Sequence, residues 1–122
     1  MGRALVAAGA LLGFVGVAAG AFGGHALRSR LTEDRLASFR TAAEYQLWHA
    51  LATIMAGLVA TRWQSGWVAT GGWLFVVGVV LFSGSLYALA VTGRRRFGAV
   101  TPIGGLSLLA GWLCVALGAF VA

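Results

Sequence analysis

The chain has 122 residues, of which 60% are hydrophobic and only 10% are charged. A soluble domain of this length cannot bury so much apolar surface, so the composition excludes an ordinary water-soluble fold. The net charge of +6 comes from arginines scattered between apolar stretches. Because no soluble basic domain carries these arginines, the charge favours contact with anionic lipid headgroups and argues against nucleic-acid binding.

Four uncharged or nearly uncharged stretches are long enough to cross a bilayer. A hydrocarbon core of about 30 Å requires about 20 helical residues, and only a helix satisfies its own backbone polar groups in lipid. We therefore predict an all-α integral membrane protein, one domain over residues 1–122, built as a bundle of four transmembrane helices. The expected spans are residues 4–25, 43–61, 67–91 and 102–120. A cleaved signal peptide is the less favoured alternative for the first stretch.

Residues 32–42 have the pattern of an amphipathic helix. Thr32 is a good N-cap, and Glu33 and Asp34 place negative charge in the first helical turn. Apolar residues then recur at spacings of three and four, starting with Leu36 and Phe39. We predict a short helix on the membrane surface between the first two spans, running into the second span.

The arginines predict the orientation of the bundle. Seven of the nine lie in the connections between spans 1 and 2 and between spans 3 and 4. Cytoplasmic connections are enriched in arginine and lysine, so both connections are expected inside and both termini outside. The expected location is a bacterial plasma (inner) membrane.

Small residues repeat at spacings of three and four along the first and fourth spans. Such seams let helix backbones approach closely, and they serve either the interior of one chain or contact with another copy or a larger complex. The expected packing positions are Gly9, Gly13, Gly16, Gly20, Gly104, Gly111 and Gly118.

Polar residues near the inner ends of spans 1 and 2 form the first candidate site. Because ionisable residues in spans usually face the protein interior, we expect one cluster there. Its members are His25, Glu44, Tyr45, Gln46 and His49. The cluster can be read as a structural hydrogen-bond network, as a site for a small molecule, lipid headgroup or quinone, as a proton relay, or as a pair of histidine ligands for haem or a metal.

A second candidate site lies before the fourth span. Arg94, Arg95 and Arg96 precede the free backbone N–H groups around Thr101, where an anionic lipid headgroup could bind. The alternative is a loop that only sets topology. No Ser/His/Asp arrangement, carboxylate pair or CxxC pair is present in the sequence, and we expect no metal, cofactor or catalytic residue.

Several motifs in order along the chain resemble one known family. They are GAFGGH at residues 20–25, YQ at 45–46 with HAL at 49–51, FSGSLY at 82–87, TPIGG at 101–105 and GW at 111–112. This pattern resembles domain-of-unknown-function family 423, which is similar to the eukaryotic transmembrane protein 256, although Gly24 stands where alanine is expected. The resemblance implies a small multi-span protein of the bacterial plasma membrane or the mitochondrion, with no established activity, substrate or cofactor.

The sequence thus favours a non-enzymatic accessory or scaffolding protein that packs with itself or with a larger membrane complex. The alternative is a small transporter or a protein that binds a lipid or quinone through the His/Tyr cluster. A membrane enzyme acting on lipid is a third hypothesis.

Overall fold

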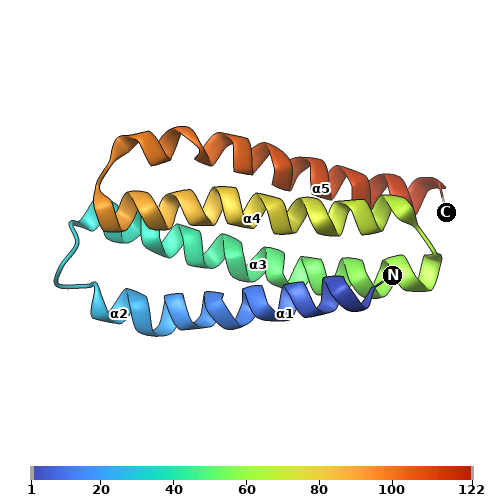
Figure 1. Cartoon of the computed structure of the whole chain (residues 1–122), viewed down its shortest axis with the longest axis horizontal. Coiled ribbons are helices and arrows are strands. Elements are labelled where there is room, and N and C mark those ends of the chain that lie inside the picture. Colours follow the sequence, from blue (N-terminus) through green and yellow to red (C-terminus); the bar gives the residue numbers. More distant parts are fainter. Residues whose placement is uncertain (1, 122) are drawn as a thin grey trace.

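The computed structural model describes residues 2–121, and its regular structure is entirely helical. The first helical rod consists of α1 (Arg3–Ala18), a π-helical turn (Ala19–Gly23) and the short α2 (Gly24–Ala26). It is followed by α3 (Glu33–Trp63), α4 (Gly66–Thr92), a 3₁₀ turn (Arg95–Ala99) and α5 (Thr101–Val121). Four long rods therefore run back and forth along one axis (Figure 1).

Three of these rods are long and apolar enough to cross a membrane: Arg3–Ala26, Gly66–Thr92 and Arg95–Val121. The rod formed by α3 is longer still but more polar, because its first turns carry charges and its middle carries Gln46 and His49. The second span at 43–61 stays a prediction, and the buried position of those polar groups is compatible with it.

The expected surface helix at 32–42 is not a separate element. It forms the first turns of α3, which runs without a break to Trp63. Leu36 and Phe39 are buried, and the Phe39 ring lies 5.0 Å from the ring of Tyr87 on α4. The apolar face of this segment therefore packs within the protein. The helix is continuous because no glycine or proline lies between this segment and the predicted span.

Local signals fix where the helices start and stop. The Thr32 hydroxyl accepts a hydrogen bond from Arg35 N over 3.3 Å, and the Ser65 hydroxyl accepts one from Val68 N over 3.2 Å. Gln64, with φ at 52°, caps the C-terminal end of α3, and Gly93, with φ at 71°, caps that of α4. Both residues adopt the left-handed conformation that closes helices, which glycine adopts at least cost.

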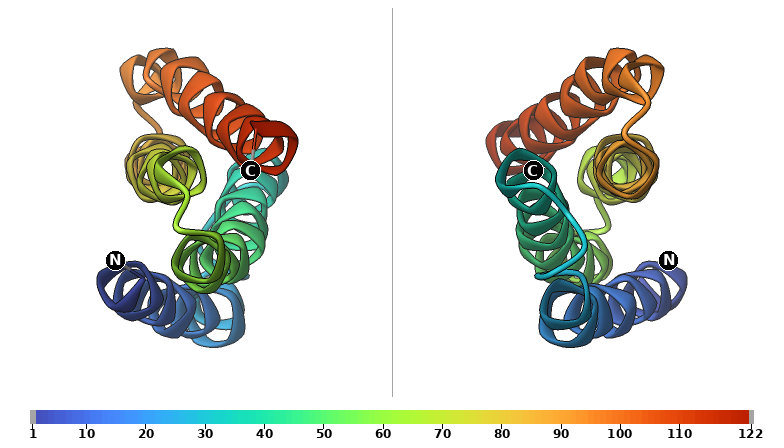
Figure 2. Two further views of the ribbon diagram at one scale, coloured as in Figure 1. Left: turned by 90° about the vertical axis from the view of Figure 1, so that its right-hand side faces the viewer. Right: turned by 90° about the vertical axis from the view of Figure 1, so that its left-hand side faces the viewer.

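The four rods form an open, curved layer. Helix α3 packs against α1 and α4, and α4 packs against α5, while α1 and α5 lie at opposite edges. Viewed end-on, α1 and α5 lie on either side of the α3–α4 pair (Figure 2). The core lies where α3, α4 and α5 meet, and includes the fully buried Phe75 with Val79 and Leu108.

Candidate functional site

A buried glutamine joins three helices. Gln46, only 3% exposed, donates a hydrogen bond from Nε2 to the carbonyl oxygen of Leu12 on α1 over 2.8 Å. Its Oε1 accepts a bond from the Tyr87 hydroxyl on α4 over 2.7 Å. One turn before Gln46, the Ala42 carbonyl accepts a bond from Ser83 over 2.8 Å. These bonds link the helices inside an apolar environment, where an unpaired polar group is costly.

His49 lies one turn deeper on α3 and is only 5% exposed. Its Nδ1 is 2.8 Å from the Tyr45 carbonyl oxygen, and its Nε2 is 3.0 Å from the indole Nε1 of Trp112 on α5. A carbonyl only accepts and an indole N–H only donates, so Nδ1 carries the proton and Nε2 does not. The geometry therefore holds His49 as one neutral tautomer and uses both ring nitrogens.

Aromatic rings surround His49 and its hydrogen bond to Trp112. The His49 ring lies 5.4 Å from Phe75 and 5.8 Å from Trp112, in edge-to-face arrangements. The ring centroid of Tyr45, one turn before His49, lies 4.6 Å from that of Phe82 on α4, so the aromatic contacts extend to this turn of α3. Such contacts add to the packing energy and fix the orientation of the imidazole.

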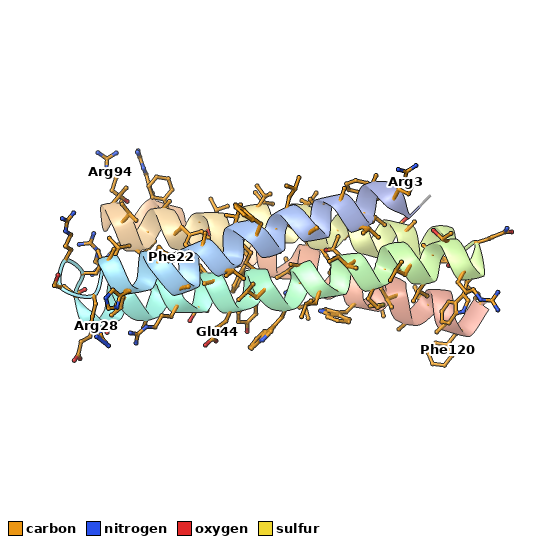
Figure 3. All side chains as sticks on the ribbon, turned by 90° about the horizontal axis from the view of Figure 1, so that it is seen from below. Arg3, Phe22, Arg28, Glu44, Arg94 and Phe120 are labelled. Carbon is orange, nitrogen blue, oxygen red and sulfur yellow. The ribbon has the colours of Figure 1, made fainter. Side chains whose placement is uncertain are left out.

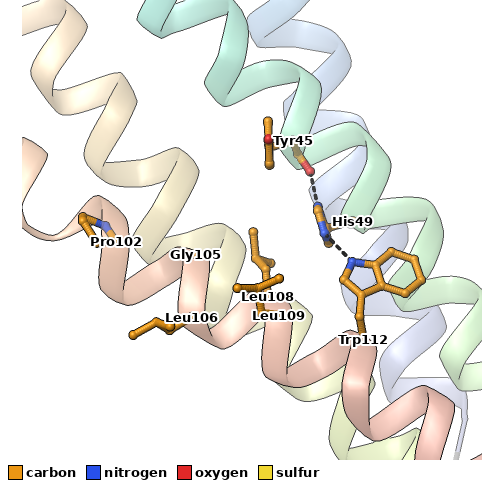
Figure 4. A pocket seen from close by; sticks show the side chains of 8 residues that line it. All are labelled: Tyr45, His49, Pro102, Gly105, Leu106, Leu108, Leu109 and Trp112. Carbon is orange, nitrogen blue, oxygen red and sulfur yellow. Dashed lines mark hydrogen bonds between the residues drawn. The ribbon is translucent and has the colours of Figure 1, made fainter.

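A groove opens beside His49, between α3 and the first half of α5. Its volume is about 530 Å³, which lies in the range of small-molecule sites. Figure 4 shows its lining, which is apolar except at the aromatic end. The lining residues are Tyr45, His49, Pro102, Gly105, Leu106, Leu108, Leu109 and Trp112.

The structure separates two of the five expected cluster residues from the other three. His25 is exposed in α2, and Gly23, two residues earlier, lies against the ring of Phe39. Phe39 is ten residues before His49, which is about 15 Å along a helix. Glu44 is also exposed and projects away from the bundle (Figure 3). The site therefore consists of Tyr45, Gln46 and His49, completed by Tyr87 and Trp112.

The arginines of the second candidate site are exposed at one end of the bundle. Arg94 lies at the end that also carries Arg28 (Figure 3), and the exposed Arg95 and Arg96 follow it directly in the chain. The Thr101 hydroxyl is 2.6 Å from the hydroxyl of Ser85 on α4. Thr101 thus joins α5 to α4 in this structure, while the arginines remain available to solvent or headgroups.

The glycines singled out for helix packing face other helices of the same chain. Gly9, Gly13, Gly16 and Gly20 lie against α3, with Gly9 closest to Ala50 and Ile54. Gly104 lies against the backbone of α4, Gly118 lies against Val68 at the start of α4, and Gly111 lies against Phe75. The seams therefore contribute to the interior of one chain.

The cluster expected from the sequence included neither Trp112 nor Tyr87. Both are aromatic residues with a polar atom, which in lipid needs a partner. That requirement signals a hydrogen bond, but it does not name the acceptor.

Among residues 2–121, no three His, Cys, Asp or Glu side chains gather closely enough to hold a metal ion.

Comparison with known proteins places similar sequences in bacterial membranes. The pattern of a family described as "Protein of unknown function (DUF423)" matches residues 19–105. A UPF0382 membrane protein of Staphylococcus haemolyticus is 43% identical over 114 residues, covering 92% of this chain and 91% of the relative. The UPF0382 inner membrane protein YgdD of Escherichia coli is 41% identical over 110 residues, covering 90% of this chain and 84% of the relative. No solved structure matches the chain.

Proposed function

We propose, from the premise that this chain belongs to the DUF423 family of small multi-pass membrane proteins, that it binds a lipid-soluble molecule in the groove between α3 and α5 without chemically changing it. The observation that carries the proposal is the groove itself, an apolar recess of about 530 Å³ with one aromatic and polar end. Binding sites for small molecules have this combination of apolar walls and few polar groups.

Binding is favoured over transport because the polar side chains do not form a path across the bundle. Toward the end opposite the arginine-bearing connections, the hydroxyls of Thr53 and Thr61 bond to carbonyls of their own helix, at 2.6 Å and 3.0 Å. Binding is favoured over catalysis because both nitrogens of His49 are already engaged in bonds to the protein. A general base needs a free nitrogen within reach of its substrate.

We propose the bacterial plasma membrane as the location, in keeping with the name of the Escherichia coli relative. The end of the bundle that carries seven of the nine arginines would face the cytoplasm, and both termini would face outside. Anionic lipid headgroups would surround the arginine-bearing end.

Native mass spectrometry of the full chain, extracted in mild detergent, tests the binding proposal. Gly105 lines the groove, and a Cβ there would meet Phe82 at an ordinary contact distance of 3.8 Å. Gly105→Leu should therefore fill the groove without disturbing helix packing. We expect the native chain to retain a lipid-soluble molecule and the variant to lose it.

The matched control is Gly84→Leu, because Gly84 is exposed on α4 and a Cβ there would meet nothing within 4 Å. This variant should retain the molecule. Equal retention by the native chain and both variants would contradict the groove as the binding site.

A second candidate function, an accessory or scaffolding role, is favoured by a different recess. An apolar groove of about 390 Å³ lies between α1 and α3, and its lining combines small and larger aliphatic residues: Gly9, Ala10, Gly13, Val17, Leu47, Ala50, Leu51 and Ile54. Grooves of small residues accept a neighbouring transmembrane helix. Ala10→Leu should then shift the mass of the intact assembly toward the monomer, whereas a native chain that is already monomeric would contradict this role.

A further inference from the structure

The depth of the α3–α5 groove in the bilayer can be derived from charges on α3. Glu44 and Arg62 are both exposed, and they lie eighteen positions apart in one continuous helix. At about 1.5 Å per residue this is about 27 Å, close to the hydrocarbon thickness of a bilayer. Exposed charges avoid hydrocarbon, so the two residues mark its two boundaries.

The groove therefore lies within one leaflet. Tyr45 adjoins Glu44 at the boundary, and His49 lies about one turn deeper. The wall formed by α5 runs from Pro102 to Trp112, about 15 Å along the helix, which is half of the hydrocarbon thickness. The boundary end of the groove is the end that carries the arginine-bearing connections.

The polar atoms of the lining define what the deep part can accept. The His49 nitrogens are bonded to the Tyr45 carbonyl and to Trp112 Nε1. Among the lining side chains, the Tyr45 hydroxyl is the polar group that no described residue engages. A polar ring placed deep in the groove would find no free donor there, which is unfavourable in an apolar environment. An acyl chain fits, with its ester group near Tyr45.

Charge selects among lipids that carry such chains. Arg94, Arg95 and Arg96 are exposed and lead into α5, so the α5 wall carries cations at the boundary end. At that end of the bundle, seven arginines outnumber the three carboxylates, Glu33, Asp34 and Glu44. This excess of positive charge complements a headgroup with a net negative charge.

We infer that the groove holds one acyl chain of an anionic glycerophospholipid from the leaflet at the arginine-bearing end. The ester group lies at Tyr45, and the phosphate lies at the arginines of the α4–α5 connection. This inference rests on the proposed function, since it names the ligand class of the same groove.

The test compares three probes on the full-length protein in detergent, followed by native mass spectrometry. The probes are phosphatidylglycerol, phosphatidylcholine with the same acyl chains, and a menaquinone. We expect phosphatidylglycerol to bind at least about tenfold more tightly than phosphatidylcholine. Neutralising Arg94, Arg95 and Arg96 as glutamines should remove this preference, whereas Arg62→Gln at the opposite end should leave it unchanged.

The groove variant separates the two levels of the proposal. Gly105→Leu should abolish binding of both phospholipids, with circular dichroism confirming that the variant is folded. If the native chain binds the two phospholipids equally, or prefers menaquinone, the inference is overturned. The proposed groove still stands in that case, provided that Gly105→Leu abolishes the binding. Binding that Gly105→Leu does not affect overturns both.

Discussion

The indole Nε1–H of Trp112 donates a hydrogen bond to Nε2 of His49 over 3.0 Å, although the two residues lie 63 positions apart in the chain. Helices α3 and α5 make few other contacts, since α5 packs mainly on α4. This bond therefore closes the deep end of the groove and joins two helices that otherwise pack mainly on α4.

Trp112→Phe should lower stability by about 1 kcal/mol, because it leaves Nε2 of His49 without its donor. Trp73→Phe is a matched control, since Trp73 and Trp112 are both 45% exposed. Thermal unfolding in detergent should show a melting temperature a few degrees lower for Trp112→Phe than for the control. Equal effects of the two substitutions would mean that the bond contributes nothing measurable.

Gln46 and Tyr87 should be energetically coupled. Tyr87→Phe removes the donor to Gln46 Oε1, and Gln46→Leu removes the acceptor together with the bond to Leu12. A double-mutant cycle from unfolding in detergent should give a coupling energy of about 0.6–1.7 kcal/mol. The same cycle between Tyr87→Phe and Ser107→Ala, whose hydroxyl bonds to Leu74 instead, should give a value near zero. Similar values in the two cycles would contradict a direct bond.

Arg35 should not tolerate replacement by lysine. Its Nε and Nη2 donate to the carbonyl oxygens of Ala90 and Val91, each over 2.6 Å, and so satisfy the last turn of α4. Lysine lacks the planar fork that reaches two acceptors at once. We expect Arg35→Lys to lower the melting temperature and Arg40→Lys, at an exposed position, to leave it unchanged. An unchanged melting temperature in Arg35→Lys would show that the fork is dispensable.

Gly104 and Gly84 should respond in opposite directions to alanine. A Cβ at Gly104 would clash with the backbone of Phe82, so the helices must shift at a cost of about 1–3 kcal/mol. At Gly84 a Cβ meets nothing within 4 Å, and alanine should stabilise the helix by up to about 1 kcal/mol. Chemical or thermal unfolding of both variants checks the signs, and destabilisation by Gly84→Ala would contradict the expected open face.

Cysteine labelling should reveal the orientation. In a Cys114→Ser background, Ser29→Cys lies in the connection after α2, and Gly66→Cys lies at the exposed start of α4. An impermeant maleimide added to whole cells or spheroplasts should label the second variant and not the first. Labelling of Ser29→Cys from outside would reverse the proposed topology.

Much of the architecture follows from local chemistry. Apolar stretches long enough to cross a bilayer must form helices, and the charged clusters must lie between these helices. The caps at Thr32 and Ser65 act within a few residues of the helices they start. Glycines spaced by three and four, such as Gly9 and Gly16, identify a face on which a neighbour can approach closely.

The composition of the site depended on how each helix is rotated and which helices are neighbours. Successive residues on a helix point about 100° apart, so Glu44 and Gln46 lie on nearly opposite faces although they are close in sequence. Gln46 therefore enters the interior, while Glu44 faces outward. The sequence by itself determined that this chain forms long apolar helices with arginine-bearing ends. Only the tertiary structure decided that His49 meets Trp112 and that a groove opens beside them, because both depend on contacts between helices distant in the chain.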